Sequence, residues 1–419
     1  MLSEVERGVL AAVDDARIVA DLRELVQIPS VDGTAEESEI QGWVAERLRE
    51  AGLEVDHWQF DLPALTGDPD FPGWEVDRAD AWGCVGVTSG GGTPGLVFNG
   101  HVDVVPVGDL AQWPDGDPFA ARVSDGVMWG RGTCDMKGGL AAIIGAVAAI
   151  TASGVTLRKP LAVHTVVGEE DGGLGAFGTL KRGHTGEACL IAEPTSGGVI
   201  PANAGSLTFR LEVPGLATHG STRTRGVSAI EKFAVIQQAL MTLEAERNLD
   251  PHPLLKHLDL ANPLSVGTVQ AGDWASTVPD LLVAEGRYGV RLGEPVAEAR
   301  HAFEQALATA CAADNWLRDH PVKVTWPGGI FASGVLPEGD PLLDDTLRAA
   351  TAAGASGAPE VKGGPYGSDL RLYAAAGIPT LQYGPGDVRY AHAVDEHVSL
   401  AEVLHCARTY ALLAVRRCS

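Results

Sequence analysis

The chain has 419 residues, 45% of them hydrophobic and 21% charged, a composition typical of a globular protein with two domains. The net charge of −24 repels phosphate backbones and anionic lipid, which argues against nucleic acid and membrane as partners. The six cysteines form no CxxC pair, so the sequence suggests neither a thiolate zinc site nor a disulfide framework and predicts reduced, buried thiols.

The first 22 residues carry acids where a signal peptide needs bases and an apolar stretch, so we expect an amphipathic helix in a cytoplasmic protein. Short apolar runs followed by turn residues predict strands at 96–98, 161–167, 189–191 and 380–383. Helical stretches are expected at 38–51, 138–150, 174–182 and 341–353. This alternation indicates an α/β sheet covered on both faces. The apolar run at 138–150 is too short to span a bilayer and predicts a buried core helix.

The segment 205–328 has a different pattern. Residues 206–213 alternate between apolar and polar side chains, as in a half-exposed strand. The expected elements that follow are a helix at 227–246, strands at 264–269 and 280–291, a helix at 295–313, and a strand at 322–326. The order β-α-β-β-α-β describes a small α+β, ferredoxin-like unit. We therefore expect an α/β catalytic domain with a mixed sheet at 1–204 and 329–419, and an inserted domain at 205–328 that is suited to a dimer contact.

Histidine and acidic residues follow the predicted strands. The segments are GHVDVVP with His101 and Asp103, GEEDGG with Glu169 and Glu170, AEPT with Glu193, YAHAVDEH with His392, and WGRGTCDMKGG with Asp135. In an open α/β sheet, ligands gather at the carboxyl ends of the strands, so these side chains should share one crevice.

The number of ligands predicts a pair of divalent metal ions. Two imidazoles and three carboxylates give each ion three protein ligands if one carboxylate, Asp135, bridges both. One ion would take His101 and Glu193, and the other Glu170 and His392. Glu169 is left over as a general base for a water that bridges the two metals, and Asp103 follows His101 closely enough to orient its imidazole.

These segments, taken in order together with ATHGSTRTRG, VPD, GSDLR and GPG, resemble the acetylornithine deacetylase, succinyl-diaminopimelate desuccinylase, aminoacylase and glutamate carboxypeptidase family of di-zinc metallopeptidases. The resemblance extends over nearly the full chain and implies the same roles for the residues above. It also implies a homodimer through the inserted domain, in which His219 reaches the partner's active site to stabilise an oxyanion. Arg291 and Gly386 would bind substrate. The cofactor would be two zinc ions per chain, with cobalt or manganese possible.

Two departures from the family pattern affect the substrate contacts. Ser276 stands where the family often has Asn, and Gly289 stands where it often has an acid. Glu193 favours deacylases or carboxypeptidases over aminopeptidase-like members. The sequence therefore predicts hydrolysis of the amide bond in an N-acyl amino acid, with a dipeptidase or carboxypeptidase as the alternative. A silent binding or regulatory protein would need a lost ligand or base, and none is lost.

Overall fold

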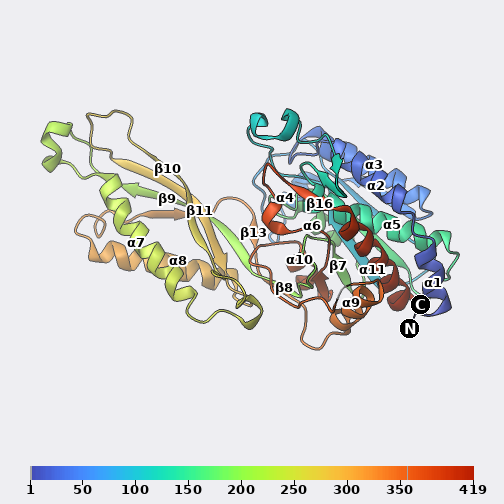
Figure 1. The fold of residues 1–419 in the computed structure, drawn as a ribbon. Helices are drawn as coiled ribbons and strands as arrows, with labels where there is room; N and C mark the ends of the chain where they lie inside the picture. Colours follow the sequence, from blue (N-terminus) through green and yellow to red (C-terminus); the bar gives the residue numbers. More distant parts are fainter. Residues whose placement is uncertain (1, 356) are drawn as a thin grey trace. The chain divides into compact units, whose positions relative to one another are not determined.

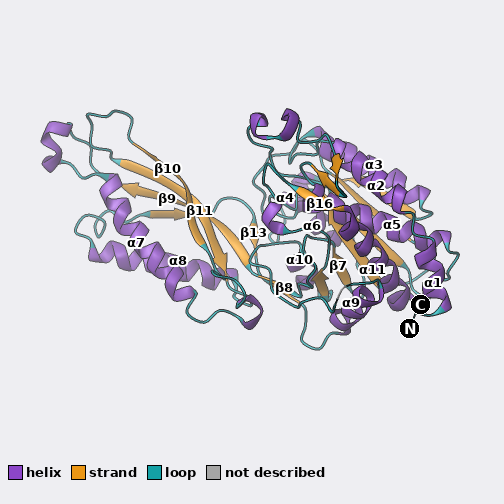
Figure 2. Cartoon of the chain, in the orientation of Figure 1, coloured by secondary structure: helices purple, strands orange, loops and turns teal. Residues whose placement is uncertain are grey.

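The computed structural model describes residues 2–355 and 357–419. They form two compact units (Figures 1 and 2). The first comprises Met1–Ala202, Val335–Lys362 and Ser368–Ser419, and the second comprises Asn203–Gly334 and Gly363–Gly367. The segment predicted as an insertion, 205–328, falls within the second unit.

The first unit is built on a six-stranded mixed sheet. The sequence predicted a mixed sheet and four of these strands. Its strands, in spatial order, are β1 (Glu54–Gln59), β2 (Trp82–Val87), β6 (Leu161–Val166), β3 (Leu96–His101), β7 (Cys189–Ile191) and β15 (Thr380–Gln382). The last four run parallel, whereas β1 and β2 pair antiparallel at one edge. Strands β3, β6 and β7 are buried along their whole length, as expected for a sheet covered on both faces.

Helices cover both faces of this sheet. They are α1 (Glu4–Ala11), α2 (Asp15–Gln27), α3 (Ala35–Glu50), α4 (Leu62–Thr66), α5 (Gly138–Ala152), α6 (Leu174–Lys181), α9 (Pro341–Ala352), α10 (Leu370–Ala375) and α11 (Leu400–Cys418). On one face the ring of Phe98 lies 5.3 Å from that of Tyr410 on α11. On the other, Asn99 donates to the hydroxyl of Tyr373 on α10 at 2.9 Å.

The predicted core helix is confirmed. The segment Thr133–Ala152 is long and apolar enough to cross a membrane by length and composition, but 83% of its 18-residue apolar stretch is buried inside the protein. It begins with the irregular turn η3 (Thr133–Lys137) and continues as α5.

The prediction of one N-terminal helix was wrong, because the chain forms two. Helix α1 begins with a capping box between Ser3 and Glu6. Asp14 then accepts the main-chain N–H of Arg17 at 3.0 Å and caps α2, so the backbone leaves the helical conformation between the two helices.

The second unit is a five-stranded sheet with two helices on one face (Figure 1). The strand order is β10 (Leu264–Ala271), β11 (Leu281–Val290), β9 (Gly205–Pro214) and β12 (Lys323–Thr325), with β13 (Ile330–Phe331) also paired to β9. Strand β9 alternates buried and half-buried residues, and its buried side packs against α7 (Ala229–Arg247) and α8 (Val296–Ala313). The predicted β-α-β-β-α-β order is therefore present.

The remaining elements are short. They are strands β4 (Arg122–Ser124), β5 (Val127–Trp129), β8 (Ala202–Asn203), β14 (Gly334–Val335) and β16 (His397–Ser399), and single turns η1 (Leu110–Gln112), η2 (Pro114–Gly116), η4 (Gly220–Arg225), η5 (Pro253–Leu255) and η6 (Val388–Tyr390). All six cysteines are free and buried, as predicted.

Candidate metal centre

Three neighbouring parallel strands bring four of the predicted residues to one edge of the sheet. His101 is the last residue of β3, and Glu169 and Glu170 lie in the turn after β6. Glu193 lies just beyond the end of β7. Because β6, β3 and β7 are parallel and adjacent, their carboxyl ends meet at this edge.

The buried ion pair between Arg131 and Glu396 fixes Asp135 and the segment that carries His392. The Glu396 carboxylate accepts the main-chain N–H groups of Cys134 and Asp135, each at 3.1 Å, through one oxygen. Its other oxygen lies 2.5 Å from Arg131 Nη1. Arg131 Nη2 in turn donates to the main-chain carbonyl of His392 at 3.1 Å. Two segments far apart in sequence are thereby held at the same place.

The Asp135 carboxylate lies between two imidazoles, with one oxygen toward each. Asp135 Oδ1 is 3.0 Å from His101 Nε2, and Asp135 Oδ2 is 3.6 Å from His392 Nε2. On the His101 side, Glu193 Oε1 lies 3.8 Å from the same ring nitrogen. On the His392 side, Glu170 Oε1 lies 3.1 Å from Nε2. The five side chains thus form two groups that share Asp135.

This donor set fits two divalent cations. Zinc binds imidazole nitrogen and carboxylate oxygen at about 2.0–2.2 Å, which sets tetrahedral ligand atoms about 3.3 Å apart. The four nitrogen–oxygen separations, from 3.0 to 3.8 Å, bracket that value. Hydrogen bonds that the imidazole donates to Asp135 and then to Glu170 raise the pKa of His392 to about 11. Metal binding must therefore displace a proton from this imidazole.

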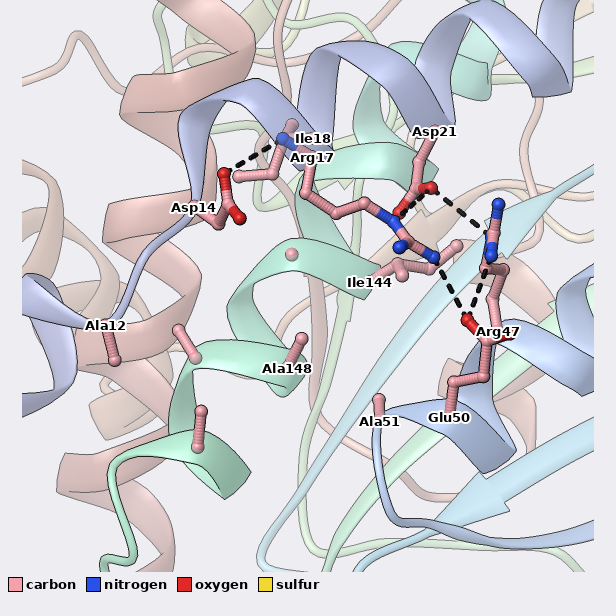
Figure 3. A pocket seen from close by; sticks show the side chains of 13 residues that line it. Ala12, Asp14, Arg17, Ile18, Asp21, Arg47, Glu50, Ala51, Ile144 and Ala148 are labelled. Atoms are coloured by element: carbon pink, nitrogen blue, oxygen red, sulfur yellow. Dashed lines mark hydrogen bonds and ion pairs between the residues drawn. The ribbon is translucent and has the colours of Figure 1, made fainter.

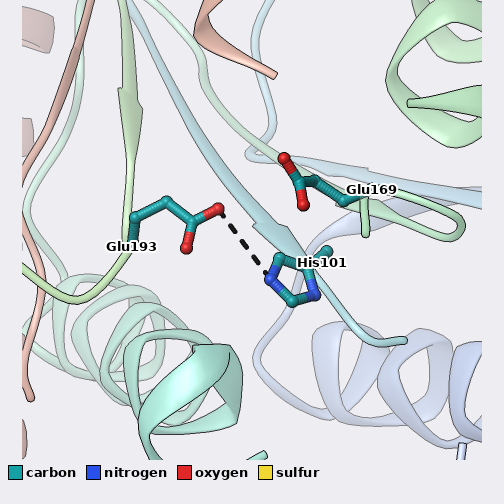
Figure 4. A group of neighbouring side chains, drawn as sticks. All are labelled: His101, Glu169 and Glu193. Atoms are coloured by element: carbon teal, nitrogen blue, oxygen red, sulfur yellow. Dashed lines mark ion pairs between the residues drawn. The ribbon is translucent and has the colours of Figure 1, made fainter. Parts of the chain in front are cut away.

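Glu169 is a buried carboxylate with a free oxygen. Figure 4 shows Glu169 and Glu193 reaching toward the His101 ring from different segments, and the three side chains offer atoms within 4.8 Å of one another. Among the described residues, Glu169 Oε1 has no hydrogen-bond partner. Burial, then Glu193 and Asp369, raise the pKa of the Glu169 carboxyl well above its usual range. A group in this state can accept a proton and release it again.

Asp103 lies beside His101, but the imidazole contacts its main-chain oxygen more closely than its carboxylate. The His101 Nδ1 atom is 3.0 Å from the main-chain oxygen of Asp103 and 3.8 Å from its carboxylate. The carboxylate instead accepts the main-chain N–H of Glu170 at 3.1 Å. The residue therefore contacts both the imidazole and the turn that carries Glu170.

His219 belongs to the second unit. It precedes the turn η4, is exposed, and its Nδ1 lies 2.7 Å from Ser221 Oγ. The next residue, Gly220, donates its N–H to the carbonyl of Ser276, the position that departs from the family pattern.

Arg291, also in the second unit, follows β11. Its Nε donates to the main-chain oxygen of Arg247 at 3.2 Å, and its main-chain N–H donates to Glu294 at 2.8 Å.

Gly386 has a packing reason to be glycine. Its backbone has φ = 96°, and an added Cβ would lie 2.7 Å from Cys134 Sγ. Its N–H donates to Glu402 at 2.9 Å. A substrate-binding role for this residue stays a prediction.

Arg131 and Glu396 were not predicted from the sequence. Both stand inside segments that carry predicted ligands, GRGTCDM and AVDEH, and the signal was a charged residue four positions from such a ligand. Their pairing is not readable from the sequence, because the two residues are 265 positions apart.

Residues 97–416 match a family model described as peptidase family M20/M25/M40. The chain is 31% identical over 417 residues to succinyl-diaminopimelate desuccinylase of Gluconacetobacter diazotrophicus, covering 94% of this chain and 95% of that protein. It is 29% identical over 404 residues to N-formyl-4-amino-5-aminomethyl-2-methylpyrimidine deformylase of Bacillus subtilis, covering 91% and 89%.

Solved structures share the fold at lower identity. The dipeptidase Dug1p of Saccharomyces cerevisiae superposes with a TM-score of 0.77 at 16% identity, and all of both chains is covered. Human carnosine dipeptidase 1 superposes with a TM-score of 0.73 at 15% identity, with 99% of each chain covered.

Proposed function

The chain belongs to peptidase family M20/M25/M40, and from that premise we propose that it removes the acyl group of an N-acyl amino acid by hydrolysing the amide bond. Membership makes it a metallopeptidase-type amide hydrolase. Relatives about 30% identical to it are named a desuccinylase and a deformylase, which favours a deacylase. The observation that carries the proposal is the Asp135 carboxylate between His101 and His392, together with Glu169, whose Oε1 has no hydrogen-bond partner among the described residues.

In this proposal His101 and Glu193 would hold one divalent ion, Glu170 and His392 would hold the other, and Asp135 would contribute to both. Zinc fits the donors best, and cobalt or manganese fits as well. When bound, the ions supply Lewis acidity to the substrate carbonyl and lower the pKa of water. Glu169 takes a proton from the attacking water and delivers it to the amine nitrogen as the C–N bond breaks.

Two residues of the second unit complete the proposed site. His219 from a partner subunit would donate to the oxyanion, and Arg291 would bind the substrate carboxylate with its planar fork. The supporting observation for His219 is an exposed ring whose Nδ1 accepts the main-chain N–H of Ser221 at 3.2 Å, which leaves the proton on Nε2 as the donor.

A homodimer through the second unit follows from the same proposal. Strand β10 is the edge of its sheet and carries the half-exposed Val269. Helix α7 exposes Ile230 and Met241 by more than half of their surfaces. An edge strand and apolar side chains of this kind are covered in a stable assembly.

The six free, buried cysteines are consistent with a cytoplasmic location, which we also propose.

A hydrolysis screen tests the function. Protein stripped by a chelator and reloaded with zinc should bind about two ions per chain and cleave acetyl-, succinyl- or formyl-amino acids. Faster cleavage of dipeptides would favour the dipeptidase or carboxypeptidase alternative, for which the shared fold of two dipeptidases is the supporting observation. Full activity after complete removal of metal would refute both.

A further inference from the structure

Arg78 is a buried cation that bonds three carboxylates at once. Its Nη2 lies 2.9 Å from Asp32 Oδ1, its Nε lies 2.9 Å from Glu37 Oε2, and its Nη1 lies 2.8 Å from Asp171 Oδ2. The Arg78 side chain is 0% exposed, and its three partners are at most 5% exposed. The planar guanidinium spreads its donors over three nitrogens, so that each nitrogen bonds a different carboxylate here. None of these four residues has a role in the proposed mechanism.

Asp32 is tied to the segment that follows strand β3. Its main-chain N–H donates to the carbonyl of Val104 at 3.1 Å, and the N–H of Val104 donates to the carbonyl of Ser30 at 2.9 Å. The hydroxyl of Ser30 donates to the carbonyl of Val102 at 2.6 Å. These bonds hold the segment of Asp32 alongside Asp103, the residue that contacts His101.

The Arg78 cluster, defined as Arg78 with Asp32, Glu37 and Asp171, reaches the candidate metal centre along two routes. The first is the turn after β6, in which Asp171 directly follows Glu169 and Glu170. Asp171 Oδ2 also accepts the main-chain N–H of Val76 at 2.9 Å, so the turn is bonded both to Arg78 and to the loop before it.

The second route is Asp103. Its side chain is completely buried, and one oxygen accepts the N–H of Glu170 at 3.1 Å. The other oxygen, Oδ1, has no hydrogen-bond partner among the described residues. Asp32, Glu37 and Asp103 each offer an oxygen within 4.8 Å of the others, a separation that one water molecule spans between two oxygens.

The balance of buried charges in the cluster determines the protonation state of Asp32. Four carboxylates and one guanidinium are buried together, and a buried charge without compensation is strongly unfavourable. Burial, then Asp103, raise the pKa of Asp32 to about 10. A second cation is a poor alternative to a proton, because Arg78 Nη2 already bonds both Asp32 and Glu37 and would repel it.

We propose that Arg78 and a protonated Asp32 are positioning residues for the metal centre: they hold Asp103 against His101 and fix the turn that carries Glu169 and Glu170. This inference rests on the proposed metal centre but names residues outside it. Asp32 accepts from Arg78 through one oxygen and presents its proton toward the unpaired oxygen of Asp103, directly or through one water molecule.

The test compares Asp32→Asn with Asp32→Ala. Asn has an oxygen to accept from Arg78 and an N–H to donate toward Asp103, so it should keep zinc affinity within about threefold of the wild type. Ala provides neither group and should weaken zinc binding about 10–100-fold, the usual effect of losing a group behind a metal ligand. Zinc affinity is measured by competition with a chromogenic chelator, and kcat and KM are measured separately on the reloaded protein.

A matched control comes from another buried carboxylate of the first unit. Asp21 is 4% exposed, lies 2.8 Å from Arg17 and 3.3 Å from Arg47, and lines a separate cavity of about 420 Å³ (Figure 3). Asp21→Asn should lower the free energy of unfolding but leave zinc affinity unchanged. Arg78→Lys should lower zinc affinity as Asp32→Ala does, because the three donors of an ammonium share one nitrogen and cannot reproduce the planar fork that reaches the three carboxylates.

Each outcome decides for or against the proposal. If Asp32→Asn weakened zinc binding as much as Asp32→Ala does, Asp32 would act as an anion and its protonated state would be refuted. One extra tightly bound cation that only the wild type holds would have the same meaning. Unchanged zinc affinity in both Asp32→Ala and Arg78→Lys would overturn the positioning role. Zinc affinity is informative even if every amide substrate fails, so the failure of the proposed function would be recognised separately.

Discussion

The two units of the chain treat charged side chains in opposite ways. The first unit buries Arg78, His101, Asp103, Lys137 and Glu169, whereas in the described part of the second unit Arg247 is the one charged residue that is buried. A buried charge persists only where partners or a function compensate its desolvation. The first unit therefore encloses the charged groups of the candidate centre, whereas the second unit leaves side chains such as His219 exposed.

The largest effect should come from Glu169. Glu169→Gln should retain metal while kcat falls about 10²–10⁴-fold, because the amide cannot carry the proton. Glu170→Gln should instead lose a metal ion, because a neutral amide is a poorer ligand. Metal analysis and kinetics on both variants check this. The reverse pattern, with metal lost in Glu169→Gln and kept in Glu170→Gln, would exchange the two roles.

The next effect tests whether the second unit contributes a group to the reaction. His219→Ala should lower kcat about 10²–10³-fold, as the loss of an oxyanion donor does. Mixing this variant with Glu169→Gln under conditions of subunit exchange should restore about a quarter of the wild-type activity, since half of the sites in mixed dimers contain both intact residues. Activity of the mixture no greater than the sum of the two variants would show that each chain supplies its own His219.

A smaller effect is expected at Arg291. Arg291→Met should raise KM about 10–100-fold with little change in kcat for substrates that carry a free carboxylate. The same variant should act on the corresponding methyl esters as the wild type does, which provides the control. Equal losses on both kinds of substrate would assign Arg291 to the packing of its own unit, where it bonds the carbonyl of Arg247.

The smallest effect concerns stability and vanishes at neutral pH. Burial lowers the pKa of His164 to about 3, whereas an unfolded histidine titrates near 6.5. Below pH 6.5 the unfolded chain therefore binds a proton that the folded chain does not, and the folded state loses stability as the pH falls toward 3. At pH 5 this loss is about 2 kcal/mol.

His164→Asn should remove most of that acid-dependent loss, because Asn retains a polar atom for the Tyr373 hydroxyl and does not titrate. Urea unfolding at pH 7 and pH 5, with chelator present throughout, measures the difference. The exposed His301→Asn variant should follow the wild type. An identical pH dependence in all three proteins would contradict a neutral, buried His164.

Much of the centre was predictable because the parallel sheet brings strand ends together. His101 ends β3, whereas Glu170 and Glu193 follow β6 and β7, and adjacency of those strands suffices to place their side chains at one edge. The apolar run of α5 and the alternation in β9 likewise predicted a core helix and a half-buried strand, because burial follows side-chain periodicity. These are local patterns, each readable within one segment.

The contacts that orient the centre were decided by the tertiary structure alone. Arg131 meets Glu396 across 265 residues, and Arg78 meets Asp171 across 93 residues. The break between α1 and α2 depends on Asp14 capping the second helix, where periodicity alone favoured one helix. The sequence by itself determined which residue types follow which strands. Folding determined which buried charges compensate each other, because a desolvated charge is stabilised by an opposite charge that is close in space, however distant it is in sequence.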